Sequence, residues 1–135
     1  MKYVIFSIDN VTDLHTLAKF THHMDVQRAM GRLHGEMKMC VGSYKGVMEY
    51  SFILKEVDFV HYVSDSDFIR DQESVLVIED GHYGETYASL HFLEYGIRGG
   101  KPQHLGLIKS VDKDTALSQD AWTYRPDLNE YFITE

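Results

Sequence analysis

A carboxylate and a hydroxyl lie two residues apart on one face of an expected strand, and this pair is the strongest chemical signal in the chain. Met37–Glu56 reads as two strands joined by a tight turn over residues 43–46. In the second strand Glu49 and Ser51 alternate with apolar residues, so they share one face. We expect that face to be covered, with Glu49 binding a cation or taking part in proton transfer. An ordinary exposed strand residue or a structural ion pair is the alternative.

The turn of this hairpin adds an aromatic ring to the carboxylate. Tyr44 is flanked by Gly42 and Gly46, and glycines either bring backbone close to a ligand or only permit the turn. A tyrosine ring beside an acidic group suits a sulfonium or ammonium ion through cation–π attraction. Ser51 is either a second ligand contact or only a small polar residue. The hairpin therefore favours a positively charged ligand.

The opposite face of the same strand is continuous and apolar, and we expect it to meet the core. It carries Met48, Tyr50, Phe52 and Leu54. Because both faces are rich in apolar residues, something must cover each of them. The candidates for the Glu49 face are the C-terminal third of the chain or another copy of it, as in a cyclic oligomer.

Composition limits the classes of protein that fit. The 135 residues correspond to one domain, and 44% apolar with 13% aromatic residues indicates a globular chain. The net charge of −8 disfavours binding to phosphate backbones and favours a cationic ligand or a protein that itself binds nucleic acid, unless it serves solubility alone. The single cysteine, Cys40, excludes an intrachain disulfide and indicates a reducing compartment. We find no membrane-span or signal-peptide pattern and expect a cytoplasmic protein.

The first 80 residues alternate strand and helix patterns. The expected elements are a strand over Lys2–Ile8, a helical region capped by Thr12 or Asp13, a stronger helix from Asp25 to Gly35, the hairpin, a helix over Val57–Gln72 that Asp58 could cap, and a strand over Ser74–Ile78. This βαββαβ order predicts an α+β fold, a ferredoxin-like sandwich with both helices on one face of an antiparallel sheet.

The last third of the chain reads as additional strands of the same single domain, 1–135. We expect a ferredoxin-like core over 1–80 and a C-terminal strand extension over 81–135. Its strand candidates are Glu85–Leu93, His104–Lys109, and a final hairpin of Trp122–Tyr124 with Glu130–Thr134. Gly96–Pro102 reads as a glycine-rich basic loop and as the segment most prone to move.

Two other groups of residues carry weaker signals. The eight histidines form no HExxH motif and the chain has no CxxC motif, so we expect no bound metal. Acids at Glu79, Asp80, Glu85 and Glu94 are interleaved with tyrosines; they either line the same pocket as Glu49 or form a solvated edge.

Three segments resemble a family of small phage enzymes that degrade S-adenosylmethionine, called SAM lyases and formerly SAM hydrolases. They are VGSYKGVMEYSF (41–52), QESVLV (72–77) and LGLIKSVDKDTALSQDAWTYRPDLNEYFITE (105–135). The resemblance implies a ferredoxin-like fold of the kind found in trimeric PII signalling proteins, with active sites between subunits and no metal. It also implies cleavage of S-adenosylmethionine to methylthioadenosine and homoserine lactone. In phages this removes the methyl donor, and sometimes the cofactor, that host restriction–modification systems require.

On this resemblance Glu49 and Tyr44 are the expected catalytic residues. Glu49 would hold the substrate ammonium and fold the methionine arm, while Tyr44 would lie against the sulfur or orient the carboxylate. Ser51, Gly42 and Ser43 are the expected substrate-binding residues, together with Glu85 as a second carboxylate from across an interface. The expected assembly is a homotrimer in the cytoplasm of a bacterial host, with S-adenosylmethionine as substrate, no further cofactor and no nucleic-acid or membrane partner.

Two other classes of function remain open. A PII-like trimeric binding protein would sequester a nucleotide-derived small molecule without altering it. An acidic protein that imitates DNA would block a nuclease, and its carboxylates would form a contiguous outer stripe.

Overall fold

The sheet is a closed eight-stranded antiparallel barrel in the computed structural model, which describes residues 1–8, 14–70, 72–93 and 101–135. Its strands are β1 (Lys2–Ser7), β2 (Lys38–Tyr44), β3 (Val47–Lys55), β4 (Ser74–Asp80), β5 (Thr86–Phe92), β6 (Gln103–Val111), β7 (Ala121–Arg125) and β8 (Glu130–Thr134). Around the barrel they follow the order β1-β3-β2-β7-β8-β6-β5-β4, and β4 pairs with β1. Closure gives every strand two partners, which removes exposed sheet edges.

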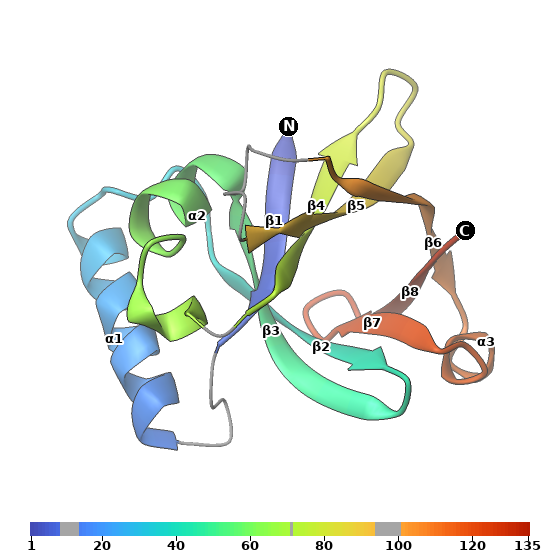
Figure 1. The fold of residues 1–135 in the computed structure, drawn as a ribbon, viewed down its shortest axis with the longest axis horizontal. Coiled ribbons are helices and arrows are strands. Elements are labelled where there is room, and N and C mark those ends of the chain that lie inside the picture. Colours follow the sequence, from blue (N-terminus) through green and yellow to red (C-terminus); the bar gives the residue numbers. More distant parts are fainter. Residues whose placement is uncertain (9–13, 71, 94–100) are drawn as a thin grey trace.

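Helices cover only part of the barrel. α1 (Leu14–Ala29), α2 (Glu56–Tyr62) and the short 3₁₀ helix η1 (Asp67–Ile69) lie together on one side of the strands, whereas α3 (Lys113–Leu117) lies beside β7 and β8 (Figure 1). Asp112 begins α3 as its N-cap, because its side chain accepts a hydrogen bond of 2.7 Å from the Thr115 amide. The two sides of the barrel are therefore covered very differently.

The hydrophobic core lies between the outer faces of β1, β3 and β4 and the helices. Alternate residues of each strand point outward into it, and aromatic rings dominate it: the Phe20 ring lies 5.0 Å from that of Phe52, and the Phe6 ring lies 5.0 Å from that of Phe59, between centroids. The buried cluster is Val4, Phe6, Ile8, Phe20, Met24, Phe52, Leu54, Phe59, Val63, Ile69, Val75 and Val77. This cluster between the strands and the helices supplies the tertiary packing. The side chains on the inner face of the strands are therefore not needed for that packing.

The prediction of a ferredoxin-like, PII-like sandwich is wrong. The expected element order is present as far as Asp80, but the sheet does not end at β2 and β4. β2 pairs with β7, and β4 pairs with β5, so the strands of residues 81–135 close the sheet into a barrel. Since a closed sheet has an inside, the C-terminal third of the same chain covers part of the face that carries Glu49: Ser51 and Ile53 are buried, whereas Val47 and Glu49 stay exposed. That was one of the two alternatives.

The strands expected in the C-terminal third are present. β7 and β8 form the predicted last hairpin, with Tyr124 opposite Tyr131. Where β5 meets β6 the register shifts, so that Ala88 lies opposite Gly106 and Ser89 lies opposite His104. Such a bulge bends a strand and increases its twist, which helps a sheet to close. Gly106 has a φ of 115°, a conformation that favours glycine.

Three details of the helices differ from the sequence prediction. Asp25 does not begin a helix but lies within α1, which runs unbroken to Ala29. Val57–Gln72 is divided into α2 and η1. Asp58 is not a cap; its buried carboxylate accepts hydrogen bonds from the backbone amides of His34 and Gly35, which tie the loop before β2 to α2. The expected caps at residues 12 and 13 and most of the 96–102 loop lie outside the described residues.

Candidate functional site

The inside of the barrel holds a cavity of about 1060 Å³. Small-molecule sites are typically clefts of roughly 300–1,000 Å³, and eight-stranded barrels of this kind have room for one small ligand. All eight strands contribute to its wall. Its apolar side chains include Ile5, Ile53, Leu76, Leu90, Leu105, Ile108 and Phe132. The cavity wall also carries both basic and acidic side chains, among them Lys38, Lys55, Arg125, Glu49 and Asp80. The cavity thus combines apolar surface with charged groups that can determine what binds.

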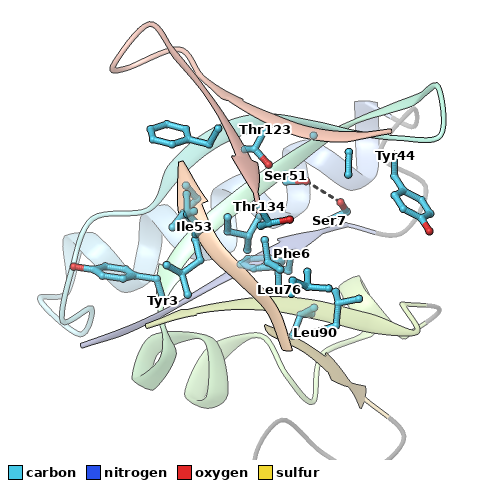
Figure 2. A pocket seen from close by; sticks show the side chains of 18 of the residues that line it. Tyr3, Phe6, Ser7, Tyr44, Ser51, Ile53, Leu76, Leu90, Thr123 and Thr134 are labelled. Atoms are coloured by element: carbon cyan, nitrogen blue, oxygen red, sulfur yellow. Dashed lines mark hydrogen bonds between the residues drawn. The ribbon is translucent and has the colours of Figure 1, made fainter. Parts of the chain in front are cut away.

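A hydrogen-bonded chain of three polar side chains lies on the wall formed by β1 and β3. The Ser7 hydroxyl donates to Glu49 Oε2 over 3.0 Å, and Ser7 Oγ lies 3.0 Å from Ser51 Oγ. Because the single Ser7 proton goes to the carboxylate, Ser51 is the donor to Ser7. Figure 2 shows the Ser7–Ser51 contact inside the cavity, with Leu76 and Leu90 on the other side. The chain holds Glu49 in place through neutral groups only.

The charge of Glu49 is left without a cationic partner among the described residues. Glu49 lines the cavity while remaining exposed to solvent, and within the described ranges its carboxylate accepts a hydrogen bond from the Ser7 hydroxyl and forms no ion pair. A carboxylate that is held in place but not neutralised attracts a positively charged ligand group. Glu49 thus lies on the wall of a cavity formed by one chain, and its side chain is exposed and not covered as expected.

Tyr44 and Gly42 reach the same cavity in different ways. Tyr44 is 61% exposed at the rim, where Lys45 Nζ lies 5.3 Å from its ring centroid, and Figure 2 shows it set apart from the hydroxyl groups. Gly42 lies directly opposite Glu49 in the β2–β3 register. A Cβ at Gly42 would meet only Ser51 Oγ, at 3.8 Å, so the space above it is open. Ser43 also lines the cavity.

Glu85 is the predicted site residue that the structure places elsewhere. It lies in the turn between β4 and β5, where its carboxylate accepts a hydrogen bond of 2.9 Å from the Tyr83 amide. It does not line the cavity, whereas the neighbouring Asp80 and Thr86 do. The acids of this part of the sequence lie close together along the chain, but their spacing did not indicate that Asp80 reaches the cavity and Glu85 does not.

Several cavity residues were missed by reading the sequence. Ser7, Thr123 and Thr134 project hydroxyl-bearing side chains into the chamber (Figure 2). For Ser7 and Thr123 a signal exists, because each directly follows a large apolar residue, Phe6 or Trp122, and successive strand side chains point to opposite faces. Thr134 could not be found in this way, because its direction depends on how the last strand closes the barrel.

Two polar groups near the chamber have altered acidity. Hydrogen bonds from Arg125 lower the pKa of the Asp127 carboxyl, and Lys38 contributes a weaker attraction from 3.6 Å. Burial raises the pKa of the Cys40 thiol to about 11. Since a thiolate and not a thiol is the nucleophile, Cys40 is an inert buried residue in this fold.

Among the described ranges, no three or more His, Cys, Asp and Glu side chains gather as metal ligands would. None of the helices in that part of the chain has the length and apolar character needed to cross a membrane. Fold and site together define a closed antiparallel barrel with a ligand-sized interior and a carboxylate, Glu49, hydrogen-bonded to Ser7 in its wall. Neither the models of known protein families nor the curated proteins contain a match to this chain.

Proposed function

We propose that the barrel is the substrate chamber of an enzyme that cleaves S-adenosylmethionine into methylthioadenosine and homoserine lactone. The observation that carries this proposal is Glu49, a carboxylate hydrogen-bonded to Ser7 on the wall of a ligand-sized cavity and lacking a cationic partner among the described residues. The likeness of the hairpin and the late stretch to SAM lyases supports the choice of ligand. Removal of the methyl donor of host restriction–modification systems by a phage is the biological role that fits this reaction.

The reaction asks little of the protein beyond positioning and electrostatics. The substrate carboxylate oxygen attacks the γ-carbon of its own methionine arm, and the bond from that carbon to sulfur breaks. The bonding electron pair passes to the sulfonium, so methylthioadenosine leaves as a neutral thioether and the arm closes to homoserine lactone. No proton, water molecule or metal is required, because the sulfonium is already a good leaving group. Holding the arm in its folded form is the main contribution of an active site here.

Glu49 is the residue to which we assign this positioning. Its carboxylate would bind the substrate ammonium, which turns the substrate carboxylate back toward the γ-carbon. Ser7 and Ser51 would keep the Glu49 carboxylate in one orientation through the chain of hydrogen bonds. Tyr44, at the rim, would lie against the positively charged sulfur.

The test is to incubate the protein with S-adenosylmethionine and to measure methylthioadenosine and homoserine lactone by chromatography. We expect Glu49→Gln to lower the rate by about 100-fold or more, because it removes the charge that holds the ammonium. The substitution preserves shape and still accepts the Ser7 hydrogen bond. Equal product formation by Glu49→Gln and the unchanged protein would refute the catalytic assignment.

Sequestration of the same ligand is the second candidate, favoured by the ligand-sized cavity inside the closed barrel of strands. A barrel that only binds S-adenosylmethionine would also withdraw it from host methyltransferases. The two functions are separated by denaturing a complex formed overnight and identifying what is released. Intact S-adenosylmethionine in stoichiometric amount supports sequestration, whereas methylthioadenosine supports cleavage.

A further inference from the structure

Four cavity residues form a row across four neighbouring strands. Glu49 on β3 lies opposite Gly42 on β2, Gly42 lies opposite Thr123 on β7, and Thr123 lies opposite Phe132 on β8. All four line the cavity. Neighbouring strands are about 4.8 Å apart, so three steps give a row of about 14 Å along the curved wall. The row therefore begins at the carboxylate and ends at an aromatic ring.

Gly42 has no side chain, so the row of cavity side chains is interrupted at β2. The absence of a side chain leaves the space between Glu49 and Thr123 open, since a Cβ at Gly42 would meet nothing within 4 Å except Ser51 Oγ. A ligand can therefore lie against the backbone of β2 while its ends contact the side chains on either side. Thr123 offers a hydroxyl on the far side of the gap, and Figure 2 shows its side chain directed into the cavity.

The outward residues of β7 and β8 explain why Phe132 is directed inward. The Tyr131 ring packs edge-to-face against Trp122 and at a tilt against Tyr124, with ring centroids 5.6 Å and 4.6 Å apart. Because successive side chains of a strand point to opposite faces, these aromatic contacts on one face leave Thr123 and Phe132 on the other face, and both line the cavity. The aromatic ring of Phe132 and the hydroxyl of Thr123 are thus held side by side by two paired strands.

We propose that the row is the binding track for the nucleoside part of the substrate, an inference that rests on the proposed function. The positive arm lies at Glu49, the sugar lies over Gly42 with a hydroxyl bonded to Thr123, and the flat base stacks on Phe132. Polar, hydroxyl-bearing and aromatic positions occur in the same order as the ammonium, ribose and adenine of an adenosyl sulfonium compound. Thr123 and Phe132 determine specificity for a nucleoside and are not catalytic residues.

The experiment uses methylthioadenosine, which contains the nucleoside but has no positive charge. Its binding is measured by calorimetry for the unchanged protein and for Thr123→Val, Phe132→Leu and Glu49→Gln. Thr123→Val keeps the shape and removes only the hydroxyl, and Phe132→Leu keeps an apolar residue and removes the ring. We expect each of these two changes to weaken binding by about tenfold, whereas Glu49→Gln changes it by less than about twofold.

A matched control is Thr86→Val, which also removes a hydroxyl from the cavity wall but on β5, away from the row. It should leave methylthioadenosine binding unchanged. In cleavage assays Thr123→Val should raise KM for S-adenosylmethionine with kcat within about threefold, because a specificity contact acts on binding. The reverse pattern, a fall in kcat alone, would contradict the assigned role.

The outcomes separate this inference from the proposed function. If S-adenosylmethionine is cleaved but neither Thr123→Val nor Phe132→Leu weakens methylthioadenosine binding, the track is wrong and the enzyme remains. If cleavage is absent but both variants weaken binding, the nucleoside track stands and the lyase proposal fails. If the unchanged protein binds neither compound, both are wrong.

Discussion

The outer and inner faces of β3 differ in packing although they belong to the same nine residues. On the outer face Phe52 and Leu54 are buried beneath the helices, at 2% and 0% exposure. On the inner face Glu49 and Ser51 border a cavity. One strand thus contributes a stabilising surface and a ligand-facing surface, and the alternation of side chains keeps the two separate. We expect substitutions on the two faces to affect different measurements.

The outer face of β3 is buried at one end of the strand and exposed at the other. Met48 and Tyr50, which were expected in the core with Phe52 and Leu54, are 64% and 52% exposed. That part of the prediction is wrong, because α1 and α2 reach only the half of β3 near Lys55. The difference shows that an apolar stripe identifies a face of a strand but not how far along the strand the covering layer extends.

The largest expected effect comes from the adjacent pair Phe52 and Ser51. Phe52→Ala should lower the free energy of unfolding by about 3–5 kcal/mol, because its ring packs against Phe6 and Phe20 in a filled core. Ser51→Ala, one residue away, should cost less than about 1.5 kcal/mol, since it removes one hydrogen bond beside a cavity. Urea denaturation of both variants measures the difference. Equal losses would mean that the two faces are not distinct.

Barrel closure is tested at Gly106. Its φ of 115° and the clash that a Cβ would make with the Glu135 carbonyl oxygen predict that Gly106→Ala costs more than about 2 kcal/mol of unfolding free energy. Gly31→Ala is the control, because Gly31 also has a positive φ, of 68°, but has nothing within 4 Å of the added atom. Its cost should be about 1 kcal/mol. Similar losses for both in thermal or urea unfolding would show that β6 can shift at no cost.

The Cys40 thiol gives a smaller effect that depends on pH. Its pKa is raised from 9.0 to about 11 in the folded protein because burial disfavours the thiolate. The unfolded chain therefore loses this proton first, so the thiol contributes stability that is complete below pH 9 and is lost between pH 9 and about 11. At pH 10 the loss is about 1.4 kcal/mol.

Comparison with Cys40→Ala isolates that contribution, because tyrosines and lysines titrate in the same range. Unfolding free energies at pH 8 and pH 10 should fall by about 1.4 kcal/mol more in the unchanged protein than in the variant. An identical fall in both proteins would mean that Cys40 titrates as an exposed thiol.

The smallest effect is expected at Glu85. Glu85→Gln should change the rate of S-adenosylmethionine cleavage by less than about twofold, because the side chain lies in the β4–β5 turn and not on the cavity. The amide oxygen can still accept the Tyr83 hydrogen bond, so the turn should keep its form. Product analysis beside Glu49→Gln makes the comparison direct. A loss as large as that of Glu49→Gln would place Glu85 at the site, for example from a second copy of the chain.

Local patterns in the sequence determined the strands and most of the hairpin site. The alternation in β3 separates Glu49 and Ser51 from Phe52 and Leu54, and this separation depends only on the period of a strand. The turn at Tyr44 and the last hairpin are equally local, because adjacent residues specify them. These features could be predicted since neighbouring residues alone carry the information.

Tertiary structure alone decided which strands pair with the edges of the hairpin and of β4. Pairing of β2 with β7 brings Thr123 next to Gly42, although 80 positions of the chain separate them, and pairing of β4 with β5 completes the barrel. An open sheet and a closed barrel share the same strand patterns; they differ only in which edges pair. Edge pairing is a long-range choice made by hydrogen bonds that any sequence can form, so no local pattern records it. The chamber around Glu49 exists because of that choice.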